Sequence, residues 1–266
     1  MTHKKTLRIE TEDHWAWIVL NRPDRRNALN AELILELQEA IAELDGQASV
    51  RAVLITGEGK AFCAGLDLEA LQQIAQKNFE ENRLDSLRYA NLLKAIVLSA
   101  KPVIAVVNGP AVAGGCGIVT ACDLALAADS AKLGYPETRI GFVPAIVSWF
   151  LLRAVGDRHA RDLLLTGRLI GAAEAKEIGL VNEVVAPSQL LERARARAAE
   201  FCECSPDSLK VTKALLAEIG CRDLDEALER ACQLNAESRA TADCIEGVAA
   251  FLEKRTPRWK INRKAQ

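Results

Sequence analysis

Two turns built from small residues, each beside an apolar run, constrain this chain more than any other feature. One spans Ala61–Leu68, with the sequence AFCAGLDL, and the other spans Asn108–Gly117, with the sequence NGPAVAGGCG. Glycine and alanine place little side chain between the backbone and a ligand, so N–H groups in such turns can approach a ligand atom closely. Because the second turn opens a predicted helix, its first N–H groups are unpaired and partially positive. We therefore expect the turns to stabilise an oxygen that becomes negative during a reaction.

A carboxylate follows downstream, in the step Tyr135–Glu137. One acid beside two converging backbone donors makes a site that can stabilise an enolate and move a proton. The chain is uncharged from Ile140 to Phe150, and an apolar wall of this kind raises the pKa of a carboxyl group by desolvation. Taken in isolation, the pair Gly114–Gly115 more often serves close packing, and a glutamate at a helix start is more often a surface residue.

Composition excludes several other classes of protein. The net charge of −2 over 266 residues argues against nucleic-acid and membrane-surface partners. No apolar run reaches the roughly 18 residues of a membrane helix, and residues 1–14 contain no apolar core of a secretory signal. The eight cysteines include no Cys-x-x-Cys pair, so we expect reduced thiols, no metal site and a cytoplasmic location.

Common nucleotide-binding and hydrolase motifs are also missing from the sequence. There is no phosphate-binding P-loop and no G-x-S-x-G nucleophile turn. The segment Gly115–Gly117 fails the dinucleotide fingerprint, because Thr120 stands where the third glycine is required.

Strand, small-residue turn and helix recur along the chain, which predicts a mixed α/β fold with parallel pairing. Strands are expected at 6–10, 15–21, 52–56, 102–107, 123–127 and 180–185, and helices at 31–44, 115–122 and, as two amphipathic stretches, between 68 and 99. From residue 145 onward the pattern is mostly helical. Asp223 with Glu226 predicts a capping box, and Thr241 begins the last helix. The apolar faces of these final helices need a partner, so we expect a subunit interface.

The two turns resemble the enoyl-CoA hydratase/isomerase (crotonase) superfamily, through AFCAGLDL at 61–68 and PVIAVVNGPAVAGG at 102–115. Further matches span the chain, at Asn21–Pro23, Asn27–Leu29, Leu165–Gly167, Ala172–Val181 and Glu246–Arg255. The resemblance implies an α/β fold, a crotonase-like spiral of β-β-α repeats with a helical C-terminal trimerisation region. It divides the chain into a crotonase-like α/β core at 1–195 and a helical C-terminal oligomerisation region at 196–266.

The resemblance also implies an acyl-CoA thioester substrate and a homotrimer or dimer of trimers. CoA enters as part of the substrate, and no further cofactor is implied. The thioester oxygen is expected between the backbone N–H groups of Leu66 and Gly114, with Glu137 as the catalytic acid–base group. Residues expected to contact the substrate or its CoA part are Arg26, Ala28, Ala64, Asp67, Leu68, Gly115, Gly117, Pro136, Ile140 and Ala145.

One position departs from the family pattern. Hydratases of this family typically carry a first glutamate on the opening turn of the helix, where this chain has Gly117. The resemblance favours hydration of a 2-enoyl-CoA to a 3-hydroxyacyl-CoA. Two alternatives stay open: isomerisation of a 3-enoyl-CoA to a 2-enoyl-CoA with the single Glu137, and a non-catalytic acyl-CoA-binding scaffold.

Overall fold

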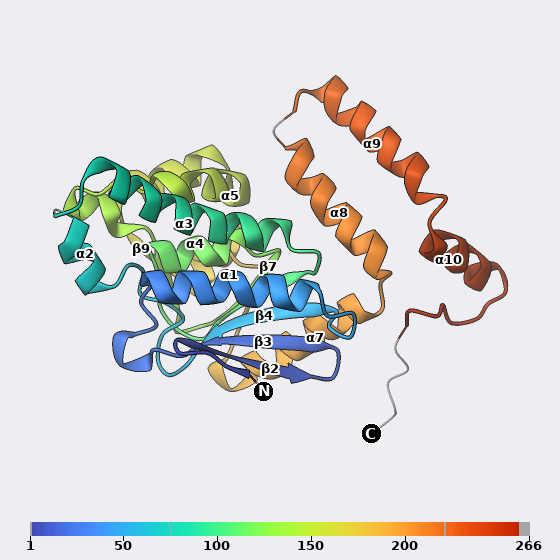
Figure 1. The fold of residues 1–266 in the computed structure, drawn as a ribbon, viewed down its shortest axis with the longest axis horizontal. Helices are drawn as coiled ribbons and strands as arrows, with labels where there is room; N and C mark the ends of the chain where they lie inside the picture. The colour runs from blue at the N-terminus through green and yellow to red at the C-terminus, as the bar shows by residue number, and fades with distance from the viewer. Residues whose placement is uncertain (1, 75, 221, 261–266) are drawn as a thin grey trace.

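A seven-stranded sheet in the order β1-β2-β3-β4-β5-β7-β10 forms the centre of the protein (Figure 1). The structure is a computed structural model that describes residues 2–74, 76–220 and 222–260. From β3 to β10 the strands pair in parallel, as predicted, and β1 and β2 add an antiparallel edge. The strands are β1 (Thr2–His3), β2 (Leu7–Glu12), β3 (Trp15–Leu20), β4 (Ala52–Gly57), β5 (Val103–Val107), β7 (Leu124–Ala128) and β10 (Glu183–Val185).

A second, three-stranded sheet lies beside the first, in the order β6-β8-β9. Its strands are β6 (Ala111–Val112), β8 (Lys132–Gly134) and β9 (Leu169–Gly171). A strand of the large sheet is followed by a strand of the small sheet and then a helix, first as β5-β6-α4 and again as β7-β8-α5. This is the expected β-β-α repeat. The strands of the small sheet were not predicted, because two or three residues are too few to show an alternating pattern.

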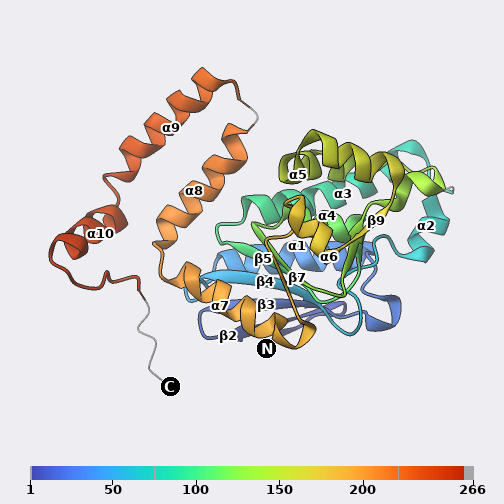
Figure 2. The same ribbon diagram turned by 180° about the vertical axis from the view of Figure 1, so that it is seen from behind.

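Helices cover both faces of the large sheet (Figure 2). On one face α1 and α4 contact the strands and α3 and α5 pack outside them, whereas α7 covers the other face. The helices of this part are α1 (Ala31–Asp45), α2 (Leu68–Ile74), α3 (Phe79–Leu98), α4 (Gly114–Ala121), α5 (Ala145–Thr166), α6 (Ala172–Glu177) and α7 (Leu190–Cys202), with short 3-10 turns η1 (Pro23–Arg25), η2 (Pro136–Ile140) and η3 (Pro187–Gln189).

The first helix illustrates how the sequence sets these elements. The side chain of Asn30 accepts a hydrogen bond from the N–H of Leu33 at 2.9 Å, which caps α1 as predicted. The leucines and isoleucine at the expected spacing are all buried against the sheet. Their burial joins α1, α3 and the strands in one apolar core, while a second core lies between the sheet and α7.

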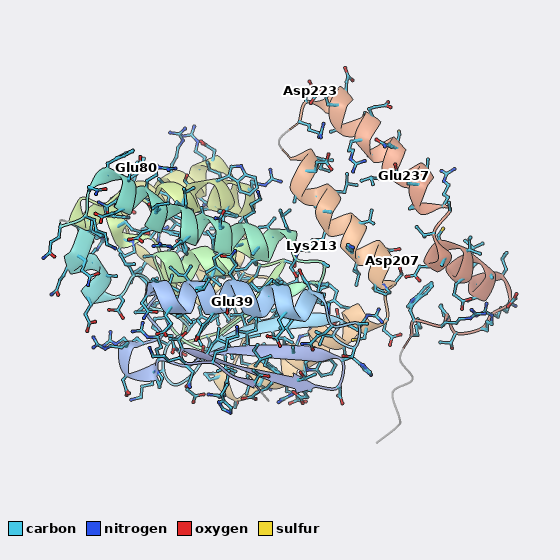
Figure 3. The ribbon with its side chains drawn as sticks, in the orientation of Figure 1. Glu39, Glu80, Asp207, Lys213, Asp223 and Glu237 are labelled. Atoms are coloured by element: carbon cyan, nitrogen blue, oxygen red, sulfur yellow. The ribbon has the colours of Figure 1, made fainter. Side chains whose placement is uncertain are left out.

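Three helices form an arm at the C-terminal end, α8 (Pro206–Ile219), α9 (Leu224–Ser238) and α10 (Ala242–Leu252), and α9 and α10 stand away from the sheet in Figure 1. The boundary expected at residue 195 falls inside α7, which packs on the sheet, so the arm begins at α8. The ammonium group of Lys213 (Figure 3) attaches α8 to the core, because it donates to the carbonyls of Ile96 (3.0 Å) and Lys101 (2.9 Å) and pairs with Asp123 (2.6 Å).

The arm exposes most of its large apolar side chains. Asp223 caps α9 by accepting from the N–H of Glu226 (2.9 Å), and Thr241 caps α10 by accepting from Cys244 (3.2 Å). Exposed apolar residues on the three helices are Leu216, Leu224, Leu228, Ile245, Val248, Phe251 and Leu252. None of the helices in the described ranges is long and apolar enough to cross a membrane.

Candidate active site

The two small-residue turns pair directly with each other. Cys63 and Ala111 form a parallel bridge, in which Val112 N–H donates to the Cys63 carbonyl at 2.9 Å. A β-carbon placed on Gly115 would lie 2.2 Å from the Cys63 oxygen, and one placed on Gly65 would lie 2.9 Å from the β-carbon of Ala113. Glycine at these two positions therefore allows a backbone approach that any side chain would prevent.

Two backbone N–H groups, those of Leu66 and Gly114, adjoin this pairing without taking part in it. Leu66 forms a parallel bridge with Leu29, in which the Leu29 N–H donates to the Gly65 carbonyl (2.7 Å) and the Asp67 N–H donates to the Leu29 carbonyl (2.9 Å). The N–H of Leu66 itself takes no part in these two hydrogen bonds. On the other turn, Gly114 is the first residue of α4, where an N–H has no acceptor within the helix. Two donors from two turns can thus converge on one ligand oxygen.

The backbone of Ala113 is strained at this point. Its φ of 51° and ψ of −124° are unusual for a residue with a side chain, and its N–H donates to the carbonyl of Gly134 at 2.8 Å. Because ψ sets the orientation of the next peptide plane, this conformation sets the direction of the Gly114 N–H. Strain held by surrounding structure is typical of functional sites.

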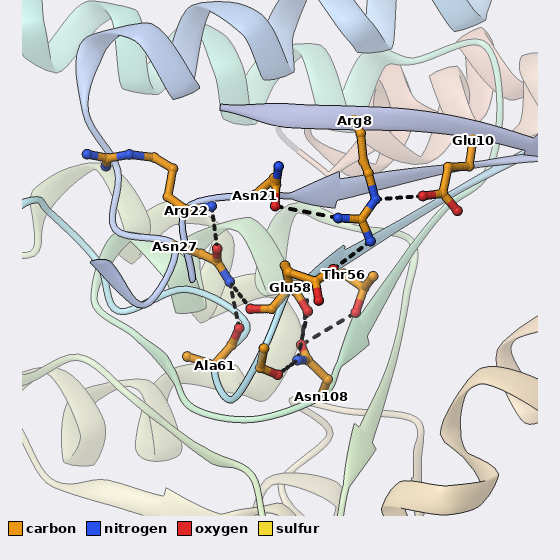
Figure 4. A network of polar contacts seen from close by, with 11 residues as sticks. Arg8, Glu10, Asn21, Arg22, Asn27, Thr56, Glu58, Ala61 and Asn108 are labelled. Atoms are coloured by element: carbon orange, nitrogen blue, oxygen red, sulfur yellow. Dashed lines mark hydrogen bonds and ion pairs between the residues drawn. The ribbon is translucent and has the colours of Figure 1, made fainter. Parts of the chain in front are cut away.

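Two amide side chains, Asn27 and Asn108, hold the neighbouring loops in place (Figure 4). The side-chain N–H groups of Asn27 donate to the carbonyls of Ala61 (2.8 Å) and Glu58 (2.9 Å), and Asn27 itself is completely buried. Asn108 donates in the same way to the carbonyl of Gly57 at 2.8 Å. These bonds fix the start of the first turn to the loop before α1, and the start of the second turn to the end of β4.

A third contact involves Asp67, one of the residues expected to contact the substrate. Its buried carboxylate forms an ion pair with Arg22 at 2.8 Å, and Arg22 also donates to the carbonyl of Ala28. Burial alone would raise the pKa of Asp67, but the Glu69 N–H and Arg22 together lower that pKa below its ordinary value. The Asp67 carboxylate is thus engaged in joining the first turn to the loop before α1.

Glu137 lies on η2 with one carboxylate oxygen buried and, among the described residues, without a hydrogen-bond partner. Desolvation raises the pKa of Glu137, with a partly opposing effect from its own backbone N–H. Its charge in turn raises the pKa of the Cys116 thiol on α4, although burial is the main cause there and brings that pKa to about 12. Glu137 therefore lies near the first turn of α4 and is poised to bind a proton.

The position of η2 depends on a contact between Tyr135 and α4. The buried Tyr135 hydroxyl forms a hydrogen bond with the hydroxyl of Thr120 at 3.1 Å. The Thr120 hydroxyl in turn donates to the carbonyl of Gly117 at 3.0 Å. Since Tyr135 is two residues before Glu137, this contact places the carboxylate relative to the helix. Pro136, between them, is half-buried.

The remaining expected contact residues divide into two groups. Arg26 and Ala64 lie together, because the carbonyl of Arg26 accepts from the Ala64 N–H at 3.0 Å. Ala28 is buried beside them, and the backbone of Leu68 starts α2, while its side chain lies outside the described structure.

The second group lies around α4 and α5. Gly115 and Gly117 are buried in α4, and Ile140 and Ala145 are exposed at the end of η2 and the start of α5. A β-carbon on Gly117 would lie 2.6 Å from Val147 Cγ1, so α5 closes this side of the site.

One residue of the site was not predicted. Tyr89, on α3, donates a hydrogen bond from its hydroxyl to the carbonyl of Gly114 at 2.6 Å. It lies in the stretch between 68 and 99 where the sequence carries no motif, and it reaches the site only through the packing of α3 on α4. The available signal was composition, because the chain has only two tyrosines and both contact α4.

An α/β spiral of β-β-α repeats with a helical C-terminal arm is the fold of the crotonase class. The chain belongs to the enoyl-CoA hydratase/isomerase family, whose pattern matches residues 10–262. It is 47% identical over 246 residues to a Thermus thermophilus relative with an enoyl-CoA hydratase description, covering 92% of this chain and 97% of the relative. It is 36% identical to a crotonyl-CoA hydratase of Syntrophomonas wolfei, covering 93% and 95% of the two chains.

Solved structures agree with the family membership. The crystal structure of an enoyl-CoA hydratase from Mycobacterium smegmatis matches with a TM-score of 0.91 at 34% identity, over 97% of this chain and 100% of that one. The predicted fold, an α/β crotonase fold with a helical C-terminal region, is therefore confirmed.

The close approach of the turns can be tested with Gly115→Ala. The new β-carbon must displace the Cys63 carbonyl, which lies 2.2 Å from its position, so the two amides move apart. We expect kcat/KM for a CoA thioester to fall roughly 10²-fold, as for loss of one oxyanion donor. In the control, Gly46→Ala, the β-carbon meets its nearest atom at 3.5 Å, and full activity is expected. Equal activity in both variants would contradict the proposed pairing.

The raised pKa of Glu137 makes a prediction about stability. A carboxyl group whose pKa is higher in the folded than in the unfolded protein binds more protons in the folded state. The contribution of Glu137 to the free energy of unfolding therefore falls as pH rises past 4.5, the ordinary pKa of a glutamate. Glu137→Gln should therefore raise Tm relative to the wild type, with a difference that grows from about pH 4 to about pH 8. Glu177→Gln, at an exposed position on α6, serves as the control. A Tm difference independent of pH would show that Glu137 is not desolvated.

Proposed function

We propose that the protein adds water across the C2–C3 double bond of a 2-enoyl-CoA and forms a 3-hydroxyacyl-CoA. The observation that carries this proposal is the buried, unpartnered oxygen of Glu137 beside the helix that presents the Gly114 N–H. Family membership supports a CoA thioester as the substrate. The hydratase descriptions of the Thermus and Syntrophomonas relatives support hydration as the reaction.

In this mechanism the thioester oxygen lies between the N–H groups of Leu66 and Gly114. Addition of an oxygen nucleophile at C3 moves an electron pair from the double bond onto that thioester oxygen. The two amides are already fixed by the pairing of the turns, so no reorganisation is needed when the charge develops. Preorganised donors of this kind each contribute about 10² to 10³ in rate.

Glu137 transfers the proton from the water to C2. Its carboxylate removes one proton from the water while the water oxygen bonds to C3. The resulting carboxylic acid then returns that proton to C2, as the enolate collapses to the thioester. One water molecule is consumed, and Glu137 ends as a carboxylate. A pKa raised by burial brings the group closer to the working pH, where a single carboxyl group can both accept and donate.

We place the CoA part of the substrate along the loop before α1 and the first turn, at Arg26, Ala28, Ala64 and the backbone of Leu68. The carbonyl of Arg26 and the N–H of Ala64 are already paired, so the exposed Arg26 side chain is left to face the phosphates. Asp67 supports this surface through its ion pair with Arg22. Pro136, Ile140 and Ala145 are placed along the acyl chain, since they flank Glu137 in η2 and α5.

A second candidate reaction is isomerisation of a 3-enoyl-CoA to the 2-enoyl-CoA. The observation that favours it is Gly117, which leaves Glu137 as the single carboxylate assigned to the site. One carboxylate can remove a proton from C2 and return it to C4 without any water. The two reactions share the same amides and differ in whether water is held near C3.

We further propose that the arm joins three copies of the chain, alone or as two trimers. The large apolar side chains exposed on α8, α9 and α10 support this assembly, because so many exposed apolar residues on neighbouring helices suit an interaction site. The buried cysteines Cys63 and Cys116 suit the reducing cytoplasm in which we place the enzyme.

The reaction is tested with crotonyl-CoA, whose conjugated absorbance disappears on hydration. We expect turnover by the wild type and a loss of roughly 10² to 10⁴ in Glu137→Gln, with CoA-ester binding retained. Growth of conjugated absorbance from a 3-enoyl-CoA, without any loss from crotonyl-CoA, would replace hydration by isomerisation. If the protein binds crotonyl-CoA and the 3-enoyl-CoA but converts neither, the non-catalytic scaffold is the remaining alternative.

The assembly is tested by light scattering. We expect a mass of three or six times the 28.9 kDa chain, and dissociation in Phe251→Glu. Phe251 is 82% exposed, so a charge there opposes association without removing buried area from the chain. Leu35→Glu, at an exposed position on α1, should leave the mass unchanged. A monomeric wild type would overturn the assembly.

A further inference from the structure

The Tyr89 hydroxyl occupies the space where a side chain at position 117 would begin. A β-carbon placed on Gly117 would lie 2.1 Å from the Tyr89 oxygen and 3.4 Å from its ring carbon Cζ. The first distance is far shorter than any non-bonded contact between a carbon and an oxygen. Tyr89 in its present position and any side chain at 117 therefore exclude each other. The hydroxyl oxygen of Tyr89, on α3, therefore occupies the space in which the family pattern has a glutamate side chain.

Three polar features of the site meet around this oxygen. The hydroxyl donates its proton to the carbonyl of Gly114 at 2.6 Å, within the residue whose N–H begins α4. The hydroxyl lies against Gly117, one turn along the same helix. Glu137 is close enough for its charge to act on Tyr89. The tyrosine oxygen thus contacts the start of α4 at Gly114 and Gly117, within the reach of the Glu137 charge.

The protonation state of Tyr89 decides what it can do. Burial raises the pKa of Tyr89 well above its ordinary value, and the neighbouring Cys63, Cys116 and Glu137 raise it further. The phenol therefore stays protonated and is unsuited to exchange its proton at neutral pH. Since that proton is directed to the Gly114 carbonyl, the oxygen lone pairs are left as hydrogen-bond acceptors.

We propose that the Tyr89 oxygen accepts a hydrogen bond from the water that adds to C3 and so holds this water for Glu137. The proposal rests on the hydratase function proposed above. One proton of the water goes to Glu137 and then to C2, as already described. The other points to the Tyr89 oxygen and stays on the water oxygen, where it becomes the proton of the new 3-hydroxyl group. Tyr89 itself neither gains nor loses a proton.

The test compares two reactions of the same site in Tyr89→Phe. Hydration of crotonyl-CoA needs the amides, Glu137 and the water. Exchange of the C2 protons of butyryl-CoA with D₂O, followed by NMR, needs the amides and Glu137 but no water at C3. We expect hydration to fall about 10- to 100-fold, corresponding to one lost hydrogen bond to the reacting water. The rate of C2-proton exchange should stay within about twofold of the wild-type rate.

Tyr135→Phe is the matched control, because it removes the other tyrosine hydroxyl that contacts α4. That hydroxyl adjoins Thr120 rather than Gly117, so it acts only through the position of Glu137. Hydration and exchange should change there by the same factor.

The outcomes separate this inference from the proposed function. If Tyr89→Phe lowers hydration and exchange equally, Tyr89 acts only by supporting the Gly114 carbonyl, and the water-holding role is wrong. Undiminished hydration in Tyr89→Phe also overturns the role, while the hydratase function stands. A wild type that exchanges C2 protons but hydrates no enoyl-CoA overturns the hydratase function and this inference together.

The geometry behind the inference can be tested separately by a double-mutant cycle. Gly117→Ala should destabilise the protein, because its β-carbon meets the Tyr89 oxygen. In the background of Tyr89→Phe that contact is gone, so the same substitution should lower the unfolding midpoint in urea by a smaller amount. An equal effect in both backgrounds would show that the Tyr89 hydroxyl does not occupy this space and would overturn the proposal.

Discussion

The backbone pairing of Cys63 with Ala111 determines where the reacting groups of this protein lie. It brings two turns, distant in sequence, close enough that Gly65 and Gly115 leave no room for side chains. A donor held this way by covalent geometry and by the surrounding loops needs little rearrangement when charge develops on its ligand. The amide groups of Asn27 and Asn108 and the strained Ala113 support the same geometry from both sides.

Helix α4 serves as the common support for the rest of the site. Its first residue carries one of the two proposed oxyanion amides, the carbonyl of Gly114 accepts from Tyr89, and Thr120 on its last turn contacts Tyr135. The carboxylate of Glu137 is therefore placed by the same eight-residue helix that places the oxyanion donor. A displacement of α4 would move both halves of the chemistry together and would preserve their mutual distance. The arm is attached elsewhere, through Lys213, so its attachment and the site depend on different contacts.

Much of this arrangement could be predicted from the sequence, and the reasons for the exceptions are physical. The long strands and α1 were visible because buried residues recur with a fixed period and Asn30 caps the helix. The turns were visible because several small residues occur in succession. By contrast, the role of Tyr89 depends on how α3 packs against α4, and nothing in the local pattern records a contact between helices. The engagement of Asp67 by Arg22 was missed for the same reason, since an ion pair across 45 positions leaves no local signature.

The exclusion between Tyr89 and a side chain at 117 also has an evolutionary consequence. A change from this site to one with two carboxylates requires a glutamate at 117 and a smaller residue at 89. The first substitution alone creates a steric clash, and the second alone leaves a cavity and removes the hydrogen bond from Tyr89 to the Gly114 carbonyl. Each single step is unfavourable, and the pair also requires Val147 to shift, because its Cγ1 lies 2.6 Å from the same β-carbon position. Such coupling makes the choice between the two kinds of site difficult to reverse, and lineages of this family that acquired the tyrosine would be expected to keep it together with the glycine.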